Sequence, residues 1–198
     1  MTEERFNKIT SVLSHRQNDL TVVLENVFDP HNISAVMRTC DAVGVQEIYI
    51  LNTQIPVHKK WGKRSSSSAL KWLTINQFDD LNSCMKAVRS QYDIVLTTYI
   101  SHDAVSLYDL DLTKKTALVF GNEHSGLSEE IRALADGNFM IPQTGMIRSL
   151  NISVACAVTL YEAYRQKGEA GHYQKQKLPD QQYENLFKQW ELNQYDND

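Results

Sequence analysis

The residues best suited to chemistry lie in the stretch PQTGMIRSLNISVAC, residues 142–156. A polar, glycine-containing loop at 142–148 runs there into an almost wholly apolar helix. The helix entry carries Ser149, Asn151 and Ser153, whose types can accept hydrogen bonds from free backbone amides. A polar loop that opens onto a buried helix can bind a ligand. An ordinary capped core helix explains the same pattern equally well.

A second candidate loop is GNEHSGL, residues 121–127. Gly121 and Gly126 allow the backbone to approach a ligand closely or to adopt positive φ. The chain has neither the GxGxxG fingerprint nor the P-loop lysine motif. A dinucleotide-dependent Rossmann enzyme and a P-loop nucleotidase are therefore both disfavoured.

A third candidate is the basic segment HKKWGKR, residues 58–64. It interleaves cations with a tryptophan, which suits phosphate contact and base stacking, although a solvated loop has the same composition. The candidate RNA contacts in this segment are Lys59, Lys60, Trp61, Lys63 and Arg64. Further candidates elsewhere in the chain are Arg5, Arg16, His31, Arg165 and Lys167.

The hydrophobic pattern predicts the scaffold that brings these loops together. Apolar, β-branched runs predict buried strands at 20–27, 47–51, 93–100, 116–120 and 138–141, with a short strand at 71–75. Helices are expected at 3–17, 33–43, 77–90, 128–135, 149–167 and 180–192. This alternation predicts an α/β fold, a mostly parallel sheet with helices on both faces. Such sheets bind ligands at the carboxyl ends of their strands, here the loops at 28–32, 97–102, 121–127 and 142–148.

Length and composition limit the class of protein. The 198 residues fit one domain, with an N-terminal helix at about 3–17 and an acidic helical tail at about 178–198. Residues 179–198 hold five acids and one base, so the tail carries the whole net charge of −4 and the other 178 residues hold 19 bases and 19 acids. A local basic site is therefore compatible with the acidic total. No apolar run reaches membrane-spanning length, no signal peptide begins the chain, and three dispersed cysteines show no metal or redox spacing. We expect a cytoplasmic protein that binds neither membrane nor metal.

Three segments together resemble a known family. They are NISAVMRTCDAVG (32–44), FGNEHSGLSEE (120–130) and IPQTGMIRSLNISVACA (141–157). In order and spacing they resemble the three motifs of the SpoU/TrmH branch of the SPOUT methyltransferases, and the likeness runs from about residue 5 to residue 170. The N-terminal segment, residues 5–44, is most similar to the subgroup that methylates the 2′-oxygen of guanosine 18 in the tRNA D-loop.

The resemblance implies properties that composition does not. It implies a deep C-terminal trefoil knot in the α/β fold, S-adenosylmethionine as the cofactor, and a homodimer with its sites at the interface. The helix after Asn151 has little polar face, so we expect it to be buried on nearly all sides, with a partner subunit covering its second face.

The resemblance also assigns roles to positions of this chain. Those matching the catalytic site are Arg38, Asn32, Glu123, Ser149 and Asn151. Those matching the cofactor site are Thr98, Gly121, Ile141, Ser149 and Leu150. Two alternatives stay open: a 2′-O-methyltransferase of ribosomal RNA or of the tRNA wobble nucleotide, and a catalytically silent RNA-binding relative.

Overall fold

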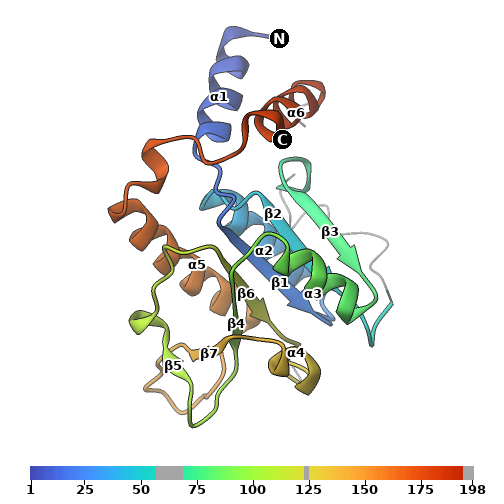
Figure 1. Cartoon of the computed structure of the whole chain (residues 1–198), viewed down its shortest axis with the longest axis vertical. Helices are drawn as coiled ribbons and strands as arrows, with labels where there is room; N and C mark the ends of the chain where they lie inside the picture. The colour runs from blue at the N-terminus through green and yellow to red at the C-terminus, as the bar shows by residue number, and fades with distance from the viewer. Residues whose placement is uncertain (57–68, 123–124, 194–198) are drawn as a thin grey trace.

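The fold is built on a seven-stranded sheet (Figure 1). The computed structural model describes residues 1–56, 69–122 and 125–193. The strand order is β3-β2-β1-β6-β4-β7-β5, and every pair is parallel. The strands are β1 (Leu20–Glu25), β2 (Glu47–Leu51), β3 (Thr74–Phe78), β4 (Ile94–Thr98), β5 (Val105–Ser106), β6 (Thr116–Phe120) and β7 (Gly137–Met140).

The central strands are apolar because both of their faces are covered. All six residues of β1 and all five of β6 are buried. Helices α2 (Pro30–Ala42) and α5 (Ile152–Glu169) cover one face, where Val36 and Leu160 join a core with Val22 and Leu118. Helices α3 (Leu81–Arg89) and α4 (Glu129–Ala133) cover the other face. The predicted α/β architecture with helices on both faces is confirmed.

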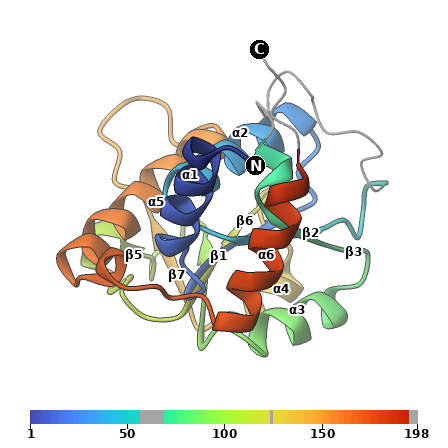
Figure 2. The same cartoon turned by 90° about the horizontal axis from the view of Figure 1, so that it is seen from above.

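A third cluster joins the two ends of the chain. Helices α1 (Glu3–Ser14) and α6 (Asp180–Leu192) lie side by side, as Figure 2 shows. Ile9 and Leu13 of α1 pack there with Leu186 and Trp190 of α6. The remaining elements are three short 3₁₀ turns, η1 (Ala69–Lys71), η2 (Leu107–Asp109) and η3 (His172–Gln174).

The predicted boundaries differ from the observed ones in physically clear ways. The first helix ends at Ser14, three residues earlier than expected, and the short strand near 71–75 lies instead at Thr74–Phe78. The helix expected from residue 149 begins at Ile152, because Asn151 is its N-cap. The two-residue strand β5 was not predicted.

In the single chain, α5 is buried along one face only. One face, with Cys156 and Leu160, is buried against α2 and the sheet. Along the other, Val154 is 48% exposed, Tyr161 54% and Tyr164 44%. The helix therefore presents an apolar, aromatic face to solvent.

Candidate active site

A cavity of about 450 Å³ lies at the carboxyl ends of three neighbouring strands. Strands β4, β6 and β7 contribute the residues at their ends, and the start of α5 closes the far side. All of the sequence-predicted cofactor positions line this cavity: Thr98, Gly121, Ile141, Ser149 and Leu150. The structure thus brings these five residues together around one cavity of ligand size.

The loop after β6 comes so close to itself that only glycine fits at Gly121. A Cβ on Gly121 would lie 2.6 Å from the backbone nitrogen of Leu127 and closer still to the carbonyl group of Gly126. Asn122 and Gly126 exchange two backbone hydrogen bonds, at 3.0 and 2.9 Å, and Gly126 has φ of +69°. The two glycines therefore serve the tight turn, and the bare backbone of Gly121 faces the cavity.

Two predicted catalytic residues from distant parts of the chain contact each other. Asn151 donates a hydrogen bond from Nδ2 to Oδ1 of Asn32, at 3.2 Å. The Oδ1 atom of Asn151 accepts from the backbone and the hydroxyl of Ser153, at 2.9 and 2.6 Å, and so caps α5. Capping and site roles thus coexist in one side chain, and the Asn32–Asn151 bridge ties the start of α2 to the cavity wall.

The three other predicted catalytic residues are Arg38, Ser149 and Glu123. Arg38 is an exposed residue of α2, the helix that carries Asn32. Ser149 lines the cavity. Glu123 lies outside the described residues, and so do the basic-segment residues Lys59, Lys60, Trp61, Lys63 and Arg64.

Two buried polar residues at the end of β1 hold the site together, and the sequence reading missed them. Asn26 has φ of +50°, and its Oδ1 accepts from the backbone nitrogens of Thr53 and Gln54, both at 2.9 Å. Its carbonyl accepts from Asn122 Nδ2 at 2.7 Å. An asparagine just after a buried strand is a recognisable signal, because asparagine tolerates left-handed backbone better than most residues.

Glu25 anchors the other end of the loop after β6. Its carboxylate is buried, and it accepts hydrogen bonds from the backbone nitrogen of Ser128 at 2.9 Å and from its hydroxyl at 2.5 Å. Ser128 is in turn the N-cap of α4. A buried charge satisfied in this way fixes the loop on the sheet.

Five of the predicted RNA-contacting residues lie in the part of the chain that the structure describes. For two of them the prediction is wrong, because their side chains are buried. The guanidinium of Arg16 is fully buried; it donates to the carbonyl of Val45 at 3.1 Å and to the carboxylate of Asp41 at 2.5 Å, and lies over the ring of Trp190. Lys167 is also fully buried, and its Nζ lies 2.9 Å from Asp19. Both cations stabilise the packing of chain segments and do not face an RNA.

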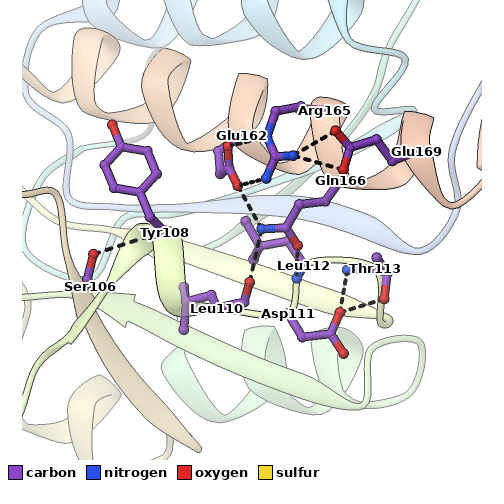
Figure 3. Close-up of polar contacts among 10 residues, drawn as sticks. All are labelled: Ser106, Tyr108, Leu110, Asp111, Leu112, Thr113, Glu162, Arg165, Gln166 and Glu169. Atoms are coloured by element: carbon purple, nitrogen blue, oxygen red, sulfur yellow. Dashed lines mark hydrogen bonds and ion pairs between the residues drawn. The ribbon is translucent and has the colours of Figure 1, made fainter.

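The remaining three candidates are nearer the surface. Arg5 donates to carbonyls at the end of α6, including that of Trp190 at 3.0 Å. His31 is exposed in the first turn of α2. Arg165 is exposed, but two carboxylates hold it: Glu162 at 2.8 Å and Glu169 at 2.8 Å (Figure 3). Its guanidinium is therefore engaged within α5 itself.

All three cysteines are buried in the core as free thiols. Cys40 of α2 and Cys156 of α5 face each other in the core; burial and the neighbouring thiol raise the pKa of Cys156. Burial likewise raises the pKa of Cys84 to about 12. Within residues 1–56, 69–122 and 125–193, no cluster of three His, Cys, Asp or Glu side chains could hold a metal. In the same part of the chain, no helix is long and apolar enough to cross a membrane.

Fold and cavity define an α/β protein with a ligand-sized cavity at the carboxyl ends of parallel strands, where such sheets bind ligands. Comparison with known proteins gives the family. The chain belongs to the SpoU rRNA Methylase family, whose model matches residues 19–161. The resemblance read from the three motifs is thereby confirmed.

Individual relatives cover nearly the whole chain. The tRNA (guanosine(18)-2′-O)-methyltransferase of Thermus thermophilus is 42% identical over 191 residues, a match that spans 96% of both chains. Among solved structures, a TrmH/SpoU tRNA modifying enzyme from A. aeolicus has a TM-score of 0.88 and 35% identity, and the match covers 97% of this chain and 98% of that one. The SpoU methyltransferase AviRb from Streptomyces viridochromogenes, solved in complex with the cofactor AdoMet, has a TM-score of 0.70 and 30% identity. That match covers 78% of this chain and 62% of the AviRb chain.

Proposed function

We propose that this protein transfers a methyl group from S-adenosylmethionine to the ribose 2′-oxygen of guanosine 18 in tRNA. One observation carries the proposal: the five predicted cofactor positions, which come from three segments of the chain, line one cavity, and Asn151 of the same cavity is hydrogen-bonded to Asn32. The choice of guanosine 18 is supported by relatives of that name that match 94–96% of the chain. Ribosomal RNA and the tRNA wobble nucleotide are the alternative substrates.

The cavity suits S-adenosylmethionine in size and in lining. Its volume of about 450 Å³ falls within the range of small-ligand sites, roughly 300–1,000 Å³. Apolar side chains such as Phe120 and Leu150 can pack on an adenine ring, and the backbone of Gly121 lies at the cavity wall. Thr98, Gly121, Ile141, Ser149 and Leu150 would hold the cofactor. When bound, it supplies a methyl group on a sulfonium. The thioether that departs is a good leaving group, so the transfer needs no metal.

The chain's own residues then have two tasks, alignment and charge stabilisation. The Asn32–Asn151 bridge fixes the cavity mouth, where the reacting ribose must be positioned; alignment of this kind can lower a barrier by about 7–11 kcal/mol at best. A guanidinium does not deprotonate in a protein, so Arg38 is not a literal base. We infer that Arg38 grips an RNA phosphate and stabilises negative charge developing on the 2′-oxygen. A phosphate oxygen or a water molecule takes the proton.

The decisive experiment maps the methylated nucleotide in RNA from cells with and without this protein. We expect a 2′-O-methyl group on guanosine 18 of tRNA to disappear; loss of a base modification instead would overturn the proposal. In purified protein, Arg38→Lys keeps the positive charge but loses the paired N–H donors of the guanidinium, so the rate of methyl transfer should fall. If Arg38→Lys worked at the wild-type rate with unchanged RNA affinity, the role given to Arg38 would be wrong.

The RNA footprint is proposed to include His31 and the basic segment with Lys59, Lys60, Trp61, Lys63 and Arg64. Each phosphate contact steepens the dependence of binding on salt. Reversing the four charges of the segment should therefore weaken tRNA binding and flatten its salt dependence. Unchanged affinity and slope would remove the segment from the footprint.

We also propose that the protein is a homodimer with a C-terminal trefoil knot, and a cytoplasmic location remains a prediction. The exposed apolar face of α5, with Val154, Tyr161 and Tyr164, supports dimerisation. Sedimentation of the wild type and of Tyr161→Glu tests this, because a buried charge should shift the mass toward the monomer. A monomeric wild type at micromolar concentration would contradict the dimer.

A further inference from the structure

We propose that Arg132 of α4 is a positioning residue for the cofactor cavity, acting through the ring of Tyr99. This inference rests on the proposed function, because it assumes that the cavity at the ends of β4, β6 and β7 holds the cofactor. Arg132 does not line that cavity itself. It reaches the cavity only through the tyrosine.

The first step is the place of Tyr99. Tyr99 follows Thr98, the last residue of β4, and its backbone nitrogen donates to the carbonyl of Phe139 at 3.3 Å. It lines the cofactor cavity and also a second, polar cavity of about 320 Å³ beside it. Among the described residues it is the only one that lines both, so Tyr99 is the wall between them.

The second step is the contact that steadies this wall. The guanidinium carbon of Arg132 lies 4.3 Å from the centre of the Tyr99 ring, within the range of a cation–π interaction. Tyr99 is 38% exposed, so part of this side chain faces solvent. The face of the ring that Arg132 covers lies toward the second cavity, whose lining Arg132 shares. Removing the guanidinium leaves the ring free to swing out of the wall.

The third step is that Arg132 is itself fixed. Its Nε donates to the carbonyl of Ser128 at 3.3 Å, one turn earlier, and its guanidinium lies 3.7 Å from the carboxylate of Glu129. Ser128 is the residue that the buried Glu25 holds on the sheet. The orientation of Arg132 therefore follows from an anchor at the end of β1.

The rest of the second cavity holds the loop after β4 in the same place. Asn138 donates from Nδ2 to the hydroxyl of Ser101 at 2.7 Å, and that hydroxyl donates to Asp103 at 2.6 Å. Since both ends of residues 99–103 are tied down, the ring of Tyr99 is the part of the wall that depends on Arg132.

The test compares Arg132→Met with two conservative variants and a matched control. Arg132→Met keeps the stem and loses the cation, so the cofactor Kd and KM should rise about three- to fivefold, the effect of one exposed cation–π contact, while kcat changes little. Arg132→Lys keeps a cation and Tyr99→Phe keeps an aromatic ring, so each variant should retain most of the wild-type affinity for the cofactor. Arg89→Met is the control: Arg89 donates to the carbonyl of Leu134, the C-cap of α4, at 2.7 Å and to the carboxylate of Asp136, just before β7, at 2.5 Å. The cation over the Tyr99 ring belongs to Arg132.

The outcomes are separable. If Arg132→Met binds the cofactor as the wild type does, or if Arg89→Met weakens binding equally, the positioning role is refuted while the proposed function stands. A double-mutant cycle of Arg132→Met with Tyr99→Leu should show coupling, and additive effects would also refute it. If the wild type itself binds no S-adenosylmethionine, the proposed function and this inference fail together. Thermal unfolding of each variant verifies that it is folded when binding is measured.

Discussion

Replacing Gly121 with alanine should damage the cavity proposed to hold the cofactor more than it damages the fold. Gly121 has an ordinary backbone conformation, so alanine brings no backbone strain there. The problem is space. The new Cβ would lie 2.6 Å from the nitrogen of Leu127 and closer still to the carbonyl group of Gly126. Since ordinary contact begins at 3.4 Å, one side of the loop must move by at least about 0.8 Å. Overpacking of this kind destabilises a protein by about 1–3 kcal/mol.

The displacement acts directly on the site because Gly121 lines the cavity. A misplacement near 1 Å can lower a catalysed rate by up to about 10²-fold, so a loss on the order of 10- to 100-fold in methyl transfer is expected. The assay measures cofactor Kd by calorimetry, single-turnover methyl transfer to tRNA, and the free energy of unfolding in urea.

Two other glycines separate the possible causes. Gly168→Ala, in α5 with nothing within 4 Å of its Cβ, should leave binding unchanged and stabilise the helix by about 0.5–1 kcal/mol. Gly126→Ala also has open space but φ of +69°, so it tests backbone strain, expected at about 1–2 kcal/mol. A Gly121→Ala protein that binds cofactor and transfers methyl at the wild-type level would refute the argument from close approach.

Further predictions concern the groups around the site. Arg16→Met leaves the carboxylate of Asp41 and buried carbonyls without their donor, so the free energy of unfolding should fall by about 2–4 kcal/mol in urea; a change below 1 kcal/mol would show that the pair does not matter. Hydrogen bonds from Arg165 lower the pKa of Glu162, so this pair stabilises the fold above the unfolded pKa of about 4.3 and loses that contribution as the pH falls through the folded pKa. Glu162→Gln should therefore lower the Tm at pH 7, and its deficit should shrink as the pH falls below the unfolded pKa; a deficit that does not change with pH would contradict this sign. The three cysteines should resist a thiol reagent at pH 8 in the native protein and react fully in denaturant; rapid native labelling would contradict their burial.

The sequence was informative wherever the physics is local. The apolar run Leu20–Glu25 becomes a fully buried strand because a central parallel strand has no solvent face. Asn151 was recognisable as a cap from its place before an apolar run. Strand β5, with two residues, is too short to carry any periodicity, so pattern reading had no signal for it.

The misreadings concern partners that lie far away along the chain. Arg16 follows an amphipathic helix and reads as a surface cation, yet Asp41 and Trp190 enclose it from positions 25 and 174 residues away. Lys167, at the end of α5, meets Asp19 from the start of β1. Burial of a long cation depends on the tertiary fold, and no window of sequence contains that information.

Burial also decides which of the basic residues can contact an RNA phosphate. A phosphate could reach Arg16 or Lys167 only after the core around them opened, because both side chains are fully buried. Arg165 differs, since it is 55% exposed and its two ion pairs lie on the surface of one helix (Figure 3). Glu162 is only 9% exposed, whereas Glu169 is 68% exposed. An exposed pair such as Arg165–Glu169 contributes only about 0.3–0.5 kcal/mol, so a phosphate can replace the Glu169 carboxylate at little cost. Arg165 can therefore exchange a partner within the chain for one on the tRNA, whereas the two buried cations have structural roles alone.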